Sequence, residues 1–196
     1  MTSSLKNKAM MIILSAPSGG GKTSIANKLL EQDNNLSLSI SVTTREARPG
    51  EQEGVHYFFK TRAEFDQMVK RGELLEQAEI YGNYYGTLGQ SVKQILSAGK
   101  DVLFDIDTQG AYQIIQTATV PTLSLFITPP DINVLEARLK ARLQDNSEVI
   151  EQRLKLAEEE MSHAKNYDYI VVNDDFDMAV KEIQNIILKA RKRIVR

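Results

Sequence analysis

A glycine-rich segment near the N-terminus limits this chain to a small group of folds. It reads A-P-S-G-G-G-K-T; the apolar run 10–14 precedes it and the amphipathic run 24–30 follows it, so we expect a strand, a loop and a helix. In such a loop, successive backbone N–H groups point into one concavity, and the helix N-terminus adds partial positive charge. The sequence therefore predicts a phosphate-binding loop, hereafter the phosphate loop, made of Ala16, Pro17, Ser18, Gly19, Gly20, Gly21, Lys22 and Thr23.

Two side chains of the phosphate loop carry chemistry of their own. The ammonium of Lys22 is placed to reach the outer phosphates of a nucleotide, and the hydroxyl of Thr23 to bind Mg²⁺. The usual pattern, G-x-x-x-x-G-K-[ST], has a glycine where this chain has Ala16, so Ala16 must keep a negative φ. A flexible surface loop is the alternative, and the strand before it and the helix after it argue against that alternative.

The composition excludes several classes of protein. With 196 residues, 42% of them hydrophobic, the chain can bury a sizeable core as one domain, with or without an inserted subdomain. A net charge of −2 gives no overall attraction to nucleic acid or to an anionic membrane, so we expect neither as a partner. The absence of cysteine excludes disulfides and thiolate metal sites, and it fits a cytoplasmic protein. The basic run 189–193 fits a helix C-terminus, where the helix dipole favours cations.

Further apolar, β-branched runs predict the strands of one sheet. Each run is followed by a helical pattern, and they cover residues 102–104, 122–128 and 169–172. Near-continuous apolar strands that alternate with helices are typical of an α/β fold, with a parallel sheet core flanked by helices on both faces. Because ligands bind at the carboxyl ends of such strands, we expect Asp105, Asp107 and Asn173 near the phosphate loop.

The two aspartates allow two interpretations. Asp105 closes an apolar strand, so it is placed to hold Mg²⁺ through a water molecule, together with Thr23. Asp107 lies two residues further on, on the same side. Either aspartate could instead cap the N-terminus of the following helix, a position where Asp is favoured.

Two segments interrupt the strand–helix alternation. Segment 37–89 shows short alternating patterns that predict antiparallel strands, with one helix over 62–71 capped at Thr61, and we interpret it as an α+β insertion. Segment 131–154 holds helical stretches separated by a polar break at 144–146. The rest forms the core of the domain: residues 1–36, 90–130 and 155–196.

Five ordered motifs give the chain a resemblance to guanylate kinases that covers nearly its whole length. They are the phosphate loop, S-V-T-T-R-E-A-R-P-G-E at 41–51, G-N-Y-Y-G-T at 82–87, D-I-D-T-Q-G at 105–110 and V-N-D-D at 172–175. The resemblance implies a P-loop kinase of guanine nucleotide metabolism that catalyses ATP + GMP ⇌ ADP + GDP with Mg²⁺. Segment 37–89 would be the GMP-binding subdomain and segment 131–154 a helical lid. Asn173 is expected at the ATP site. The sequence leaves open whether the protein forms a homo-oligomer.

The phosphate of GMP is a dianion and needs donors. Planar guanidinium groups hold a phosphate bidentately, which suits Arg45 and Arg48 on either side of a turn. Phenolic and hydroxyl donors add to them. The resemblance places all of these residues at the GMP phosphate: Ser41, Arg45, Arg48, Tyr57 and Tyr85. Taken without their context, two arginines in a polar loop would be a solvated surface pair.

The guanine base presents the N1–H and N2 amino donors beside the O6 acceptor, so a carboxylate and a hydroxyl are complementary to it. The resemblance assigns these two roles to Glu76 and Thr87, and it places Asp107 near the base. Adenine would leave buried polar groups mismatched, at a cost of about 1–3 kcal/mol each. From pattern alone, Glu76 could equally lie on a solvated face.

The arginines of segment 131–154 resemble those of the family's lid, which closes over ATP and neutralises charge on the transferring group. They are Arg138, Arg142 and Arg153, and the first two share one helix face. Family members commonly carry Gly-Arg-Gly here, whereas this chain has Ala141 and Leu143 around Arg142, which predicts a stiffer hinge or a longer helix. A solvated charged face is the alternative.

Two rival functions are compatible with parts of this pattern. Non-catalytic guanylate-kinase-like modules bind protein partners, but they typically lack an intact phosphate loop, and this chain keeps Lys22 and Thr23. A P-loop kinase for another phosphorylated acceptor would be expected to lack the pair Glu76 and Thr87. Both features therefore favour catalysis on GMP.

Overall fold

The computed structural model describes residues 9–141 and 147–194. Its centre is a five-stranded sheet in the order β2-β7-β1-β8-β9, in which every neighbouring pair is parallel. The predicted α/β sheet is thus confirmed. The strands are β1 (Met11–Ser15), β2 (Leu36–Leu38), β7 (Asp101–Asp105), β8 (Thr122–Thr128) and β9 (Tyr169–Val172).

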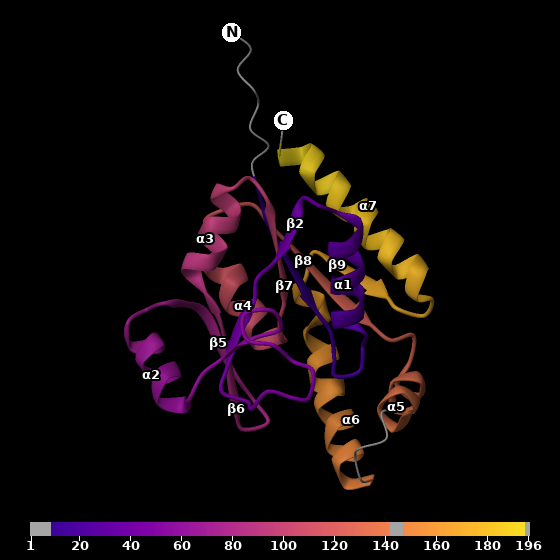
Figure 1. The fold of residues 1–196 in the computed structure, drawn as a ribbon. Coiled ribbons are helices and arrows are strands. Elements are labelled where there is room, and N and C mark those ends of the chain that lie inside the picture. The colour runs from indigo at the N-terminus through magenta and orange to yellow at the C-terminus, as the bar shows by residue number, and fades with distance from the viewer. Residues whose placement is uncertain (1–8, 142–146, 195–196) are drawn as a thin grey trace.

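Helices cover both faces of this sheet (Figure 1). One face packs on α1 (Lys22–Gln32) and α7 (Phe176–Ile194), and the other on α3 (Gly89–Ser97) and α4 (Thr108–Thr117). All five residues of β1 are buried, which explains why the strand reads as an uninterrupted apolar run. The phosphate loop follows this central strand and therefore lies at the middle of the sheet's carboxyl edge.

A second, four-stranded sheet lies beside the first, in the order β4-β3-β6-β5. Its strands are β3 (Ser41–Thr43), β4 (Phe58–Phe59), β5 (Leu74–Ile80) and β6 (Asn83–Leu88). The prediction of antiparallel strands holds for β3–β6 and β5–β6 but is wrong for β3–β4, which pair in parallel. The long connection 44–57 replaces a tight hairpin, so the chain re-enters beside β3 in the same direction. The helix α2 (Arg62–Lys70) starts at the predicted cap, Thr61, which forms a capping box with Glu64.

The segment boundaries differ from those drawn on the sequence. The strand β2 pairs with β7, so the main sheet extends to Leu38, past the boundary expected after residue 36. The segment expected to form a lid comprises α5 (Ile132–Ala141) and the start of α6 (Ser147–Ser162), and α6 continues beyond residue 154 into the short helix η1 (His163–Asn166). A small apolar cluster joins α5 to α6: Leu135, Leu139 and Ala157. Arg142 and Leu143 lie outside the described residues.

The hairpin between β5 and β6 ends in a two-residue turn, Tyr81-Gly82. Both residues have positive φ, 51° and 75°, which is the type I′ geometry that suits the twist of paired strands. Tyr81 is the one non-glycine residue with positive φ in the described ranges, and the residue is 57% exposed. The turn therefore holds an aromatic ring at the tip of the second sheet.

No helix in the described part of the chain is both long and apolar enough to cross a membrane.

Candidate active site

The phosphate loop leaves β1 and ends in α1, as the sequence predicts. Ala16 is not among the residues with positive φ, so it tolerates the place of the usual glycine. At Gly21, φ is 92°, and a Cβ there would lie 2.5 Å from Nδ2 of Asn173. The side chain of Asn173 is buried and donates a hydrogen bond from Nδ2 to the carbonyl of Gly20, at 2.9 Å. Asn173 thus fastens the loop to the end of β9.

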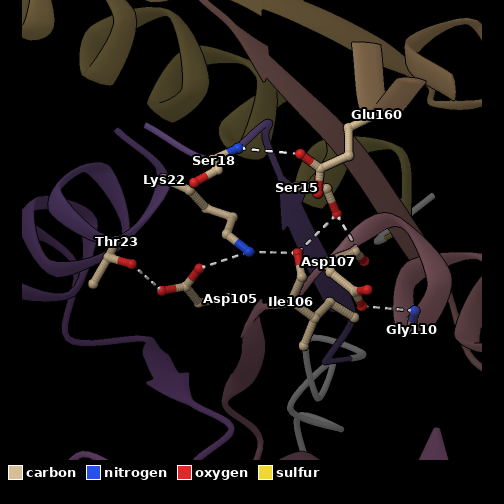
Figure 2. A network of polar contacts seen from close by, with 9 residues as sticks. All are labelled: Ser15, Ser18, Lys22, Thr23, Asp105, Ile106, Asp107, Gly110 and Glu160. Atoms are coloured by element: carbon tan, nitrogen blue, oxygen red, sulfur yellow. Dashed lines mark hydrogen bonds and ion pairs between the residues drawn. The ribbon is translucent and has the colours of Figure 1, made fainter. Parts of the chain in front are cut away.

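Three side chains meet at the mouth of the phosphate loop (Figure 2). Lys22 Nζ lies 3.2 Å from Oδ1 of Asp105 and donates to the carbonyl of Ile106 at 2.5 Å. Thr23 Oγ1 donates to Oδ2 of Asp105 at 2.8 Å. A hydroxyl and a carboxylate this close form the hard oxygen donor set that Mg²⁺ prefers. No group of three or more His, Cys, Asp or Glu side chains placed to hold a metal occurs within 9–141 and 147–194, so substrate phosphates would have to complete such a site.

A cavity of about 600 Å³ opens over the phosphate loop. The loop forms its floor, the start of α4 and the end of β5 form two walls, and α6 forms a third. Residues lining these walls are Glu79, Ile80, Tyr81, Asp107, Thr108, Gln109, Leu156, Glu159, Glu160 and His163. The volume falls in the range of small-molecule sites, so a phosphorylated ligand fits between the lid and the second sheet.

A buried acid lies on the second sheet, where it faces α4. Glu76 and Thr87 are paired across β5 and β6, and Thr87 Oγ1 donates to Oε1 of Glu76 at 2.7 Å. Glu76 is 4% exposed, and a Cβ on Gly110 would collide with its other oxygen. Burial raises the pKa of Glu76 to about 7, and the charge of Asp107 adds to this effect, while the bond from Thr87 opposes it.

Asp107 caps α4, which was the alternative role considered for it. Its backbone is extended, and its Oδ1 accepts from the backbone N–H of Gly110 at 3.0 Å. The same carboxylate lines the cavity and acts on the pKa of Glu76. Capping therefore fixes Asp107 at the site without using up its second oxygen.

We expect the Glu76→Gln variant to be more stable than the wild type at pH 8. The folded-state pKa of Glu76, about 7, exceeds the ordinary 4.5, so the folded protein keeps a proton that the unfolded chain has released, and stability falls as pH rises through this window. Above it, the penalty is at most about 3 kcal/mol, and an uncharged amide removes it. Urea unfolding should show a difference of less than about 1 kcal/mol at pH 5. An equal difference at both pH values would contradict the buried-charge explanation.

Arg45 forms a cluster with one acid and two tyrosines beside the second sheet. Arg45 Nη2 lies 2.8 Å from Oε1 of Glu51, and its guanidinium carbon lies 5.4 Å from the ring centroid of Tyr57. The rings of Tyr57 and Tyr85 meet edge to face, 6.1 Å apart. The bond to Glu51 raises the pKa of Arg45, and the same bond lowers the pKa of Glu51.

Of the other two residues predicted at the GMP phosphate, Arg48 lies beside this cluster, whereas Ser41 lies opposite Thr87. The backbone N–H of Arg48 donates to Oε2 of Glu51 at 2.7 Å, and Ser41 is paired with Thr87 across β3 and β6. Glu51 was not among the predicted site residues, although it lies within the motif that carried the resemblance. The signal that could have found it is a carboxylate three residues after Arg48, at the end of a Pro-Gly turn.

Arg138 on α5 and Arg153 on α6 contact different parts of the molecule. Arg138 Nη2 donates to the backbone carbonyl of Asn173 at 2.9 Å, while its buried Nη1 finds no hydrogen-bond partner among the described residues. A buried, unsatisfied guanidinium N–H is costly, and an anionic ligand would relieve that cost. The guanidinium carbon of Arg153 lies 5.8 Å from the ring centroid of Tyr81, across from the phosphate loop.

The comparisons with known proteins agree with this architecture. The family model for guanylate kinase matches residues 8–190. The guanylate kinase of Rickettsia bellii is 54% identical over 188 residues, which cover 96% of this chain and 98% of that protein. The guanylate kinase of Mesorhizobium japonicum is 47% identical over 191 residues, 97% of this chain and 88% of that protein.

The fold is also similar to a solved structure. The crystal structure of guanylate kinase from Anaplasma phagocytophilum superposes with a TM-score of 0.79 at 36% identity, covering 94% of this chain and 87% of that chain. The family match, the relatives and the solved structure all extend over both sheets, the phosphate loop and the lid. This chain belongs to the guanylate kinase family.

Proposed function

We propose that this protein transfers the γ-phosphoryl group of ATP to GMP, giving ADP and GDP, with Mg²⁺ as the required metal. The observation that carries this proposal is the buried pair Glu76–Thr87, which lies close enough to Lys22 for the ammonium to act on the pKa of Glu76. The proposed base-recognition pair lies against α4, whose capping residue Asp107 lines the cavity over the phosphate loop. A non-catalytic module would not need an intact phosphate loop. A kinase for another acceptor would not need the pair Glu76–Thr87.

The donor half of the site is the phosphate loop. Its N–H groups cradle the phosphates of ATP, and Lys22 exchanges its contacts with Asp105 and Ile106 for phosphate oxygens. Thr23 and Asp105 would hold Mg²⁺, Asp105 through a water molecule; bound there, the ion would neutralise phosphate charge. Asn173 keeps the loop in place through the carbonyl of Gly20.

The acceptor half lies on the second sheet. Arg45, Arg48, Tyr57, Tyr85 and Ser41 supply the donors that hold the phosphate of GMP. Glu51 already pairs with Arg45, so the guanidinium is oriented before the ligand arrives. Glu76 would accept from N1–H and N2–H of guanine, Thr87 would turn its one hydroxyl proton from Glu76 to O6, and Asp107 would lie beside the base.

The chemistry needs no general base. A phosphate oxygen of GMP is already a nucleophile at neutral pH, so the rate depends on positioning and on neutralising charge. Arg138 and Arg153 are placed on the lid to supply positive charge to the transferring group, and Arg142 is expected to join them.

ATP turnover measured with a panel of nucleoside monophosphates tests the proposal directly. GMP should be phosphorylated faster than AMP, CMP or UMP, because the other bases leave Glu76 and Thr87 mismatched. Preference for a different monophosphate would favour the rival kinase. Absence of turnover with every acceptor would favour the binding module.

The Glu76→Gln variant should use GMP poorly and ATP normally. With Thr87 bonded to O6, the carboxylate offers both oxygens to the guanine donors, whereas the amide offers only one acceptor; the lost charge-assisted bonds are worth about 1.5–3 kcal/mol. This corresponds to a roughly 10- to 150-fold lower kcat/KM for GMP. Steady-state kinetics with each substrate varied in turn measure both values, and the KM for ATP serves as the internal control. Equal changes for GMP and ATP would mean that Glu76 has only a structural role.

A further inference from the structure

The helix α6 is joined to the phosphate loop by one hydrogen bond that the sequence did not predict. The backbone N–H of Ser18 donates to Oε2 of Glu160 at 3.1 Å, although 142 positions separate the two residues (Figure 2). Glu160 also lines the cavity above the phosphate loop. A part of the lid is therefore bonded directly to the loop that receives the phosphates.

The surroundings of Glu160 show what this bond compensates. Burial raises the pKa of Glu160, and the charges of Asp107 and Glu159 raise it further, whereas the bond from Ser18 and the ammonium of Lys22 lower it. Partial burial of a carboxylate removes hydrogen bonds to water, and this costs free energy unless a protein donor replaces them. An uncharged amide oxygen could accept the same bond from Ser18 with a smaller desolvation cost.

The same face of α6 carries a second contact. Arg153 and Glu160 lie seven residues, about two turns, apart, so their side chains project from one side of the helix. Arg153 lies over the ring of Tyr81 at the tip of the second sheet. The helix thus contacts the phosphate loop near its C-terminal end and the GMP-binding subdomain further toward its N-terminus.

We propose that Glu160 is a positioning residue for phosphoryl transfer: its bond to Ser18 fixes α6 over the phosphate loop and thereby aims Arg153 at the transferring group. This inference rests on the proposed function. Seven helical residues span about 10 Å, so a tilt of about 10° at Glu160 displaces Arg153 by about 2 Å. Misplacing a catalytic group by about 1 Å can cost on the order of 10²-fold in rate.

Three single variants test the bond. Glu160→Ala removes the acceptor and should lower kcat about 10- to 100-fold, with the KM for GMP changed less than about threefold. Glu160→Gln keeps an acceptor and should retain kcat within about threefold. The matched control is Glu158→Ala, an exposed position on the same helix, which should behave as the wild type. A Gln variant as slow as the Ala variant, or an Ala variant as fast as the wild type, would overturn the proposal.

A double-mutant cycle tests whether the effect passes through Arg153. In an Arg153→Ala background, adding Glu160→Ala should lower kcat by less than about twofold, because the group being aimed is already gone. If the two losses multiply, Glu160 does not act through Arg153, and the proposal is wrong.

Two measurements keep this inference separate from the proposed function. A wild type that does not phosphorylate GMP would overturn the proposed function, whereas an active wild type with an equally active Glu160→Ala variant would overturn only this inference. Amide hydrogen exchange followed by NMR needs no turnover and no Ala variant. The Ser18 amide should exchange slowly in the wild type and in Glu160→Gln, and fast exchange in the wild type would contradict the bond.

Discussion

Replacing Lys22 by Met is expected to lower phosphoryl transfer by more than about 10³-fold while GMP still binds. The ammonium lies at the mouth of the phosphate loop, beside Asp105, and serves the phosphates of ATP. Most of the proposed acceptor residues lie on the second sheet, and the contacts of Lys22 are to Asp105 and Ile106 rather than to any of them. Turnover assays combined with calorimetry of GMP binding separate the two effects.

The matched control for this variant is Lys28→Met. Lys28 lies on the same helix, α1, where it forms an ion pair with Glu31 away from the phosphate loop. Its replacement should leave turnover unchanged, since exposed ion pairs contribute little. Turnover like that of the wild type in Lys22→Met would refute the assignment of residues 16–23 as the site for ATP.

Removing Arg138 should lower kcat about 10²- to 10³-fold with a modest change in either KM. Its buried Nη1 lacks a partner among the described residues, so it is free to bond an anion that develops in the transition state. Arg153→Ala should be similarly severe, and Arg142→Ala severe or intermediate because Ala141 and Leu143 stand where the family commonly has glycines. Single-turnover kinetics on the three variants, with circular dichroism to verify folding, measure this.

A control on the same helix distinguishes specific contacts from general charge. Lys140 pairs with Glu136 on the exposed side of α5, and Lys140→Ala should keep a normal kcat. Arg138→Lys keeps the charge but loses the planar fork, so it should remain slow. Folded arginine variants with near-normal kcat would reduce the lid arginines to a solvated charged face.

The sequence predicted those parts of the fold in which local pattern and burial agree. The strand β1 reads as an apolar run because it is buried at the centre of the sheet, and Gly21 occupies a position where any side chain would meet Asn173. The cap at Thr61 was predictable because capping is decided within four residues. For these elements, the local sequence and the tertiary packing favour the same structure.

Other features depend on contacts between distant parts of the chain. The strand β4 has two residues, too few for a pattern, and its parallel pairing with β3 follows from the path of the loop between them. Glu160 ends a run of three glutamates that looks like a solvated helix face, and only its packing against Ser18 distinguishes it from its neighbours. Such residues carry no local signal.

The site residues likewise differ in whether the local sequence or distant contacts determine their placement. Glu76 was ambiguous between a solvated face and a buried acid, because it stands in the mixed polar and apolar run E-L-L-E-Q, and the structure buries it against Gly110. Asp107 was open between two roles, and its cap on α4 is now visible. The binding and catalytic roles of these residues stay predictions until the variants are measured.

The strand order has a consequence for how such a chain can change its substrate. The chain leaves the main sheet at β2 and returns at β7, and it leaves again at β8 and returns at β9; in both cases the two strands are hydrogen-bonded neighbours. Both pairs are parallel, so each excursion leaves from the carboxyl edge of the sheet and returns at its amino edge, one strand, about 4.8 Å, to the side. A unit attached in this way can be lengthened, shortened or exchanged without disturbing β1 and the phosphate loop. The proposed acceptor module and the proposed lid are thus attached on opposite sides of β1, and each can vary while the phosphate loop stays constant.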